Sequence, residues 1–256
     1  NVFCTMWQDN GSETSQSAGF PSVAYFADLG YGADVSDKAA FSDRLLFLTG
    51  LEFKAYELMD SLERAYGDET PDASFTPTKY ALYEDPMYGM YASHIDADRF
   101  EAHFKEVADK LAGLSGKNSL TEFYRELAMT LSIKAGLSAR IKEAYDKGDK
   151  KALEDIAKVK IRACILHMEE TARLREEIWL SESKPFGYEI LDIRFAGVIT
   201  RLKYAAKRIE DYLSGRVTEL PELSEPRLPR IPGYEGKGLR VNRWDQIVSA
   251  CNVSGI

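Results

Sequence analysis

The sequence predicts a mainly helical fold, in which a helical bundle domain is preceded by a single strand–loop–helix unit. After Ser36, apolar residues recur every three or four positions, which is the spacing of helices that bury one face. Before it, residues 2–6 form a short apolar run that leads into a polar loop. Hydrophobic residues make up 45% of the chain and charged residues 29%, so the chain has enough apolar side chains to build a core.

The first unit is expected to occupy residues 1–35. Residues 2–6 are apolar without alternation, which favours a strand buried on both faces, as in a parallel sheet. A polar loop follows over residues 7–11, and residues 17–31 are expected to form a helix. Because no later segment supplies a sister strand, we expect residues 2–6 to be a strand cut from a sheet whose other strands lie upstream. The apolar face of the helix holds Phe20, Val23, Ala24, Ala27 and Tyr31.

The helical domain is expected to occupy residues 36–215. Residues 67–86 form its least regular stretch, because three prolines interrupt the helical pattern there. The long helices should pack antiparallel, since their connections are short. Residues 216–256 are expected to be an extended, Pro-rich C-terminal tail. The expected helices run from residue 37 to 59, from 96 to 114, from 119 onward, from 150 to 180 and from 188 to 213.

Capping residues mark where two of these helices begin. Ser36 or Asp37 can accept a hydrogen bond from the first free backbone N–H groups of the first helix, which Gly50 then interrupts. Ser119 is the expected N-cap of a later helix, because Glu122 stands three residues on and completes a capping box.

Charge and cysteine content exclude several classes of protein. A net charge of −8 argues against nucleic-acid binding, which needs a concentrated basic patch. No apolar run approaches the 18 residues of a membrane span, so no membrane segment is expected. Cys4, Cys164 and Cys251 are odd in number and lie in apolar surroundings, so we expect three buried thiols and a reducing compartment.

The sequence contains no recognisable metal-binding or cofactor-binding motif. His94, His103 and His167 are the only histidines, and none has the spacing of a metal site. His167 lies in a dense apolar helix and is expected to be a core residue. No phosphate-binding loop, dinucleotide fingerprint or nucleophile elbow is present, so no cofactor is expected. The adjacent acids at 68–69 and 84–85 lie among prolines, where surface charge or a turn explains them.

The loop that follows the first apolar run combines an indole with carboxylates. Trp7 and Asp9 are two residues apart at the end of the expected strand and therefore point to the same side. Ligands bind at the carboxyl-terminal edge of parallel sheets. There an indole can stack on the face of a pyranose ring, and a carboxylate can accept hydrogen bonds from the sugar hydroxyls. Asn10 and Glu13 add polar groups. The pattern indicates a sugar or polyol site; the alternative is a capping Asp and a core Trp.

Three stretches in this order resemble glycoside hydrolase family 20, the β-N-acetylhexosaminidases. Residues 5–13 followed by 18–31 are similar to the end of the catalytic barrel of that family. Residues 79–86, and residues 184–189 running into Asp192-Ile193-Arg194, are similar to the helical domain that follows the barrel in a compact bacterial branch of exo-β-N-acetylglucosaminidases. The resemblance extends to about residue 213.

The resemblance implies that the chain holds the last βα unit of a (β/α)8 barrel and then a helical domain. In the family, an Asp-Glu pair on the fourth strand does the chemistry: the Asp orients the substrate's 2-acetamido group as nucleophile, and the Glu is the general acid. That strand is absent here, so no catalytic residue is expected in this chain, and Asp68-Glu69 is not the pair. The isolated chain is expected to be inactive.

The resemblance also implies which residues bind substrate. Trp7 matches the tryptophan that walls the pocket of the non-reducing-end sugar, and Asp9 matches the carboxylate that holds its O4 and O6 hydroxyls. Asn10 and Glu13 are expected to support them. The family pattern has a small residue and a second acid where this chain has Gln8 and Asn10, which leaves glucosamine against galactosamine preference open.

Two hypotheses follow from the sequence. The first is the C-terminal portion of a cytoplasmic bacterial exo-β-N-acetylhexosaminidase, whose partners are N-acetylhexosamine-terminated glycans and its own upstream barrel. The alternative is a helical protein–protein interaction module without sugar chemistry. A third possibility is self-association, for example as a homodimer, through apolar surface that a missing barrel leaves uncovered.

Overall fold

A computed structural model of the chain describes residues 3–6, 13–66, 76–114, 118–228 and 232–233. These residues are mainly helical and include no strand, which confirms the helical part of the predicted fold class. Residues 3–6 are exposed and have no regular structure, so the predicted barrel unit is not seen in the described part of the chain. The helices are α1 (Phe20–Gly30), α2 (Lys38–Thr49), α3 (Phe53–Asp60), α4 (Pro77–Tyr83), α5 (Ala97–Ala112), α6 (Ser119–Asp146), α7 (Lys150–Asp155), α8 (Ile161–Glu182), α9 (Glu189–Leu213) and α10 (Pro221–Ser224).

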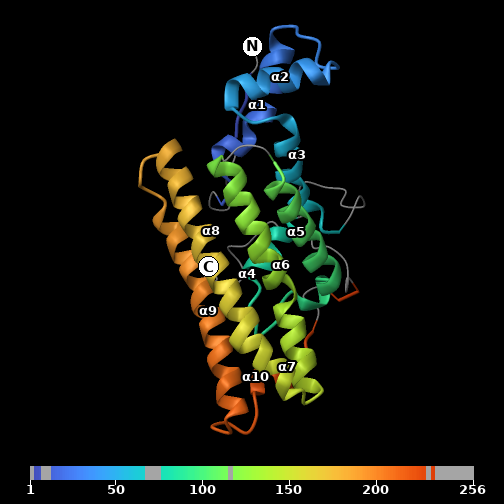
Figure 1. Cartoon of the computed structure of the whole chain (residues 1–256), viewed down its shortest axis with the longest axis vertical. Coiled ribbons are helices and arrows are strands. Elements are labelled where there is room, and N and C mark those ends of the chain that lie inside the picture. The colour runs from blue at the N-terminus through green and yellow to red at the C-terminus, as the bar shows by residue number, and fades with distance from the viewer. Residues whose placement is uncertain (1–2, 7–12, 67–75, 115–117, 229–231, 234–256) are drawn as a thin grey trace.

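Four long helices, α5, α6, α8 and α9, form an elongated bundle (Figure 1). Helix α6 packs against α5 on one side and α8 on the other, and α9 packs against α8. Each presents an apolar stripe to the centre, because residues three and four apart share a helix face. The centre of the bundle is closed to solvent: Phe100 and Phe104 from α5, Leu131 from α6 and Leu202 from α9 have no exposed surface.

The beginnings of two helices test the capping predictions. Asp37 caps α2 by accepting a hydrogen bond from the backbone N–H of Ala40 at 3.0 Å. The cap of α6 lies one residue earlier than predicted: Asn118 is the N-cap, accepting from Leu120 N at 2.9 Å, and Ser119 is the first helical residue. The prediction named Ser119 alone, although asparagine caps helices as well as serine does.

The helix predicted over residues 150–180 is interrupted. A π-helical turn at Ile156–Lys160 separates α7 from α8. The wider turn admits one extra residue and changes which side chains face inward. Ile156, Ala157 and Ile161 are all buried around it, so the turn keeps the apolar stripe in contact with the core.

Three further predictions need revision. Helix α4 lies inside the stretch expected to be least regular, and its start at Pro77 suits the first turn of a helix, where no N–H partner is needed. The short helix α10 lies in the segment expected to be an extended tail, with Leu220 and Leu223 fully buried. Cys4 is exposed while Cys164 is buried, so the prediction of buried thiols is wrong for Cys4, and Cys251 lies outside the described residues.

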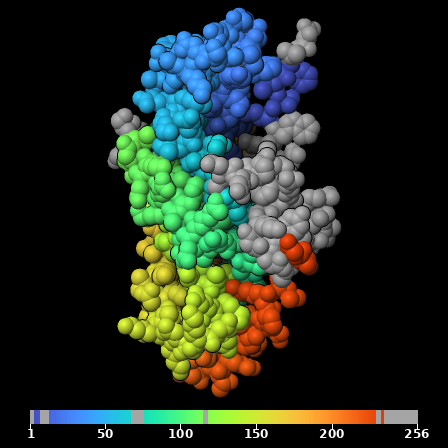
Figure 2. Space-filling model, turned by 90° about the vertical axis from the view of Figure 1, so that its right-hand side faces the viewer, coloured from blue at the N-terminus to red at the C-terminus, as the bar shows by residue number. Residues whose placement is uncertain are grey.

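An amino-terminal arm, defined here as residues 13–50, projects from the end of the bundle opposite α10 (Figures 1 and 2). It consists of the 3-10 turn Gln16–Gly19 (η1), α1 and α2. Helix α1 buries none of its residues. The last residues of the arm also have apolar side chains in contact with solvent, with Phe47 89% and Leu48 67% exposed.

Candidate functional site

Of the residues predicted to form a site, the structure describes only Glu13. Trp7, Asp9 and Asn10 lie outside the described residues, as do Asp68 and Glu69. Glu13 lies where the arm meets the bundle.

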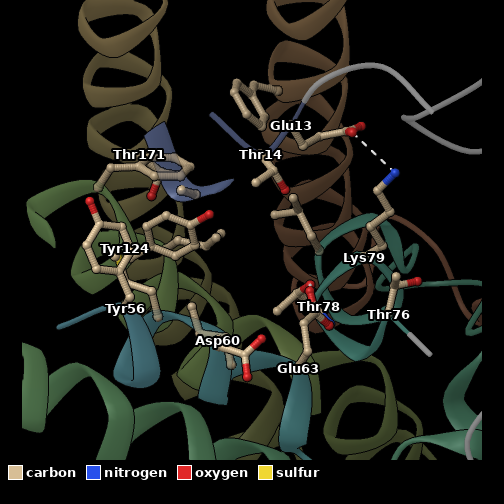
Figure 3. Close-up of a pocket in the computed structure, with 17 residues that line it drawn as sticks. Glu13, Thr14, Tyr56, Asp60, Glu63, Thr76, Thr78, Lys79, Tyr124 and Thr171 are labelled. Atoms are coloured by element: carbon tan, nitrogen blue, oxygen red, sulfur yellow. Dashed lines mark hydrogen bonds and ion pairs between the residues drawn. The ribbon is translucent and has the colours of Figure 1, made fainter. Parts of the chain in front are cut away.

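The carboxylate of Glu13 lies at the centre of a polar network. Its Oε1 accepts a hydrogen bond from Arg194 Nη1 at 2.5 Å and another from the Tyr83 hydroxyl at 3.1 Å. Its Oε2 lies 3.2 Å from Lys79 Nζ (Figure 3). Lys79 and Tyr83 are four residues apart and therefore share one face of α4, whereas Arg194 comes from α9. The ionic side chains are largely buried, with 15% of Glu13, 18% of Lys79 and 16% of Arg194 exposed.

The backbone next to this carboxylate is held by α8. Arg175 Nε donates to the carbonyl oxygen of Glu13 at 2.9 Å, and Arg175 Nη2 donates to that of Thr14 at 3.4 Å. The guanidinium also stacks over the ring of Trp179, 5.4 Å from its centroid. Burial lowers the pKa of Arg175, while the charge of Glu182 acts in the opposite direction. A guanidinium stays charged in proteins, so Arg175 remains a cation with fixed donors.

The start of the arm's first helical turn has an anionic partner on the same helix as Arg175. The carboxylate of Glu182 accepts hydrogen bonds from the backbone N–H groups of Gln16 at 3.1 Å and Ser17 at 3.2 Å. An anion is favourable at this position, because the first N–H groups of a helix have no partner inside it and carry partial positive charge. Ser15, between the two anchored stretches, is 1% exposed.

A cavity of about 310 Å³ lies beside this network, between the arm and the bundle (Figure 3). Its walls are mainly apolar and aromatic, with Tyr56, Phe123 and Phe195 among them. Glu13 and Lys79 form part of its polar side. Pockets with apolar walls and a few polar groups are the usual shape of small-molecule sites.

A second carboxyl group, that of Glu63, faces the cavity. Burial of this group raises its pKa to about 7, while hydrogen bonds from Thr78 and the charge of Lys79 limit the rise. Thr78 donates through its backbone N–H at 3.3 Å and through its hydroxyl. The hydroxyl of Thr76, also on the cavity wall, is buried and has no hydrogen-bond partner among the described residues.

His167 lies on α8 and contacts a side chain of α6. His167 Nδ1 pairs with the buried carboxylate of Glu126, but 31% of the His167 side chain is exposed, so the prediction of a core histidine is wrong. Within the described ranges, no three His, Cys, Asp or Glu side chains gather closely enough to hold a metal ion. None of the described helices is long and apolar enough to cross a membrane.

Sequence reasoning missed the helical-domain side of the network. Lys79, Tyr83 and Arg194 lie within stretches that carry the family resemblance, but no role was predicted for them. Arg175 had a signal that could have been noticed: it occupies an apolar face of its helix between Leu174 and Ile178, both buried. A buried arginine at such a position needs acceptors, and the acceptors here are backbone carbonyls 162 and 161 residues away along the chain.

Comparison with known proteins supplies the family. The family model described as the Glycoside Hydrolase 20C C-terminal domain matches residues 54–241, which is well over half of the chain. No curated protein matches the chain. The matched residues include the helices that contribute Lys79, Arg175 and Arg194, and the resemblance to glycoside hydrolase family 20 is confirmed. The chain belongs to the glycoside hydrolase 20C C-terminal domain family.

Proposed function

We propose that the chain is the C-terminal portion of an exo-β-N-acetylhexosaminidase. The enzyme would remove terminal β-linked N-acetylglucosamine, and N-acetylgalactosamine if its pocket tolerates it, by substrate-assisted retaining hydrolysis. The observation that carries this proposal is the family match over residues 54–241. It favours glycoside hydrolysis over the alternative of an interaction module without sugar chemistry.

In this proposal the chain supplies sugar-binding groups and not the reacting ones. Trp7 stacks on the ring of the terminal sugar, and Asp9 accepts hydrogen bonds from its hydroxyls. Asn10 and Glu13 support these two residues. The Asp that orients the acetamido group and the Glu that protonates the leaving oxygen belong to an upstream barrel, and no cofactor takes part.

The upstream barrel is also the proposed partner of the arm. Helix α1 would be the last barrel helix, and the apolar side chains it exposes would pack against neighbouring barrel elements. Phe20 and Val23, which share one face of the helix, are 41% and 37% exposed, which is more than a helix of a closed barrel leaves uncovered on its inner face. Self-association through the same surface remains a prediction for the chain without a barrel.

The proposal is tested by comparing the 256-residue chain with the protein that includes the upstream barrel, using an aryl β-N-acetylglucosaminide. The longer protein should hydrolyse it, and the chain alone should not, because the oriented acetamido group and the general acid both depend on upstream residues. An aryl β-glucoside, which lacks the acetamido group, should be a poor substrate. Turnover by the chain alone that disappears in Asp68→Asn or Glu69→Gln would show that the catalytic pair had been placed wrongly.

A further inference from the structure

The segment from Glu13 to Ser17 is held more closely than the start of a helix requires. Glu182 alone satisfies the N–H groups at the start of η1. Yet the carboxylate of Glu13 is also contacted by Lys79, Tyr83 and Arg194. In addition, Arg175 donates hydrogen bonds to the backbone carbonyls of Glu13 and Thr14. The holding groups come from α4, α8 and α9, which are three separate helices of the matched domain.

Stability is a weak explanation for this arrangement. Largely buried ion pairs are often no more stabilising than apolar side chains of the same size, because both charges lose their hydration. Several charge-assisted hydrogen bonds to one group fix its position and orientation, because each bond restricts the direction in which that group can point. The network therefore fits a part of the chain whose position matters more than its packing.

The residue held in this way follows the expected sugar-binding loop directly. Glu13 stands four positions after Asp9, so their Cα atoms are at most about 14 Å apart whatever the path of the chain. A fixed Glu13 thus defines one end of the loop. Groups that bind substrate work best when their support holds them within about half an ångström of the productive position.

We propose that Lys79, Arg175 and Arg194 of the helical domain are positioning residues for the sugar-binding loop, which they hold through Glu13. The inference deepens the proposed function and rests on it for the identity of the substrate. It gives the helical domain an indirect part in substrate binding, through the position of Glu13.

The test uses the protein that includes the upstream barrel. Glu13→Gln keeps the shape and the hydrogen-bonding oxygen but removes the charge that Lys79 and Arg194 contact. The KM for an aryl β-N-acetylglucosaminide should rise, and kcat/KM should fall about 10–100-fold, as for other supporting residues of an active site. Arg194→Met should have a similar effect, and combining the two changes should cost little more than either alone, because both break one interaction.

The chain offers a matched control. Arg208 and Glu222 form an ion pair of the same kind, with a 2.7 Å contact and 19% and 10% of their side chains exposed. Arg208 lies on α9, like Arg194, but 14 residues further on, which places it about 21 Å away along the helix. Glu222→Gln should lower the melting temperature about as much as Glu13→Gln does, while changing kcat/KM by less than about twofold.

A milder variant guards against misfolding. Tyr83→Phe removes one hydrogen bond to Glu13 and keeps the aromatic ring, so it should fold and lower kcat/KM roughly two- to tenfold. The proposal is overturned if Glu13→Gln and Tyr83→Phe both stay within about twofold of the wild-type kcat/KM per folded molecule. It is also overturned if Glu222→Gln reduces activity as much as Glu13→Gln.

A second readout separates this inference from the proposed function. Hydrogen exchange of a peptide covering residues 3–18 should be faster in Glu13→Gln than in the wild type, and unchanged in Glu222→Gln. If the wild type cleaves no hexosaminide, the proposed function fails, and faster exchange still supports the holding of the loop. Unchanged exchange overturns the inference whatever the activity.

Discussion

The bundle and the amino-terminal arm use similar amounts of apolar sequence in opposite ways. Helix α9 buries its apolar stripe completely at Leu191, Leu202 and Ile209. Helix α1 is no less rich in apolar residues and buries none of them. Apolar content therefore does not decide which helix is stable by itself; the presence of a facing surface does. The bundle supplies its own facing surfaces. In the arm only α2 is packed against the rest of the chain, through the buried Phe41 and Leu45, whereas α1 has no such facing surface within the described residues.

The largest expected contrast is in the free energy of unfolding. Leu202→Ala removes a side chain with no exposed surface and should cost about 2–5 kcal/mol, through lost burial and the cavity left behind. Phe47→Ala, at a position 89% exposed, should change the free energy by less than about 0.5 kcal/mol. Urea denaturation of the chain measures both. A loss at Phe47 as large as that at Leu202 would mean that the exposed face of α2 is packed as well.

The border between the two regions should make stability depend on pH. The pKa of Glu63 is about 7 in the folded chain, against a reference value of 4.5. As pH rises from about 4.5 to 7, the unfolded chain loses this proton while the folded chain keeps it. The stability that Glu63 contributes is thus complete below about pH 4.5 and is lost as pH rises through about 7, by roughly 3 kcal/mol at most.

Glu63→Gln should remove this dependence. Denaturation of wild type and variant at about pH 5 and about pH 8 should show a smaller loss in the variant, because glutamine has no proton to release. Glu57→Gln, at an exposed position of neighbouring α3, serves as the control and should retain the wild-type profile. Parallel profiles for wild type and Glu63→Gln would place the carboxyl of Glu63 in water.

A smaller effect compares the same chemical group in the two regions. Asp96 caps α5 in the bundle and Asp37 caps α2 in the arm, each accepting one backbone N–H at 3.1 and 3.0 Å. Asp96→Ala should lower the free energy of unfolding by about 1 kcal/mol. Asp37→Ala should change it less, because α2 can open without unfolding the bundle. Calorimetry of the two variants measures both changes in the free energy of unfolding. Equal losses of stability would show that the arm and the bundle unfold together.

The sequence was sufficient for the bundle because its signals are local and repeated. Each long helix carries an apolar stripe with a recognisable end, such as Asp96 before α5 and Gly215 after α9, where a positive φ of 75° suits glycine. The π-helical turn before Ile161 was missed, because one extra residue in a turn leaves the local composition unchanged. The cap of α6 was placed one residue late, at Ser119 in place of Asn118, because neighbouring cap residues are distinguished only by their backbone geometry.

Only the amino-terminal residues of the candidate site could be predicted from the sequence. Glu13 was found because it stands near Trp7 and Asp9 in the sequence. Arg175, which donates to its backbone carbonyl, and Arg194, which pairs with its carboxylate, are 162 and 181 residues away from it, and nothing in their immediate neighbourhood indicates these partners. Long-range polar contacts of this kind are fixed by how the helices pack, which only the structure gives.

The central claim is that the residues just before the arm hold the terminal sugar of the substrate, and Asp9→Asn tests it most directly. The change keeps the shape of the side chain and removes its charge, so hydrogen bonds from the sugar hydroxyls lose their charge assistance. In the protein with its barrel, kcat/KM for an aryl β-N-acetylglucosaminide should fall by roughly one to two orders of magnitude, with the melting temperature almost unchanged. Full activity of Asp9→Asn, or a loss explained entirely by a lower melting temperature, would contradict the account.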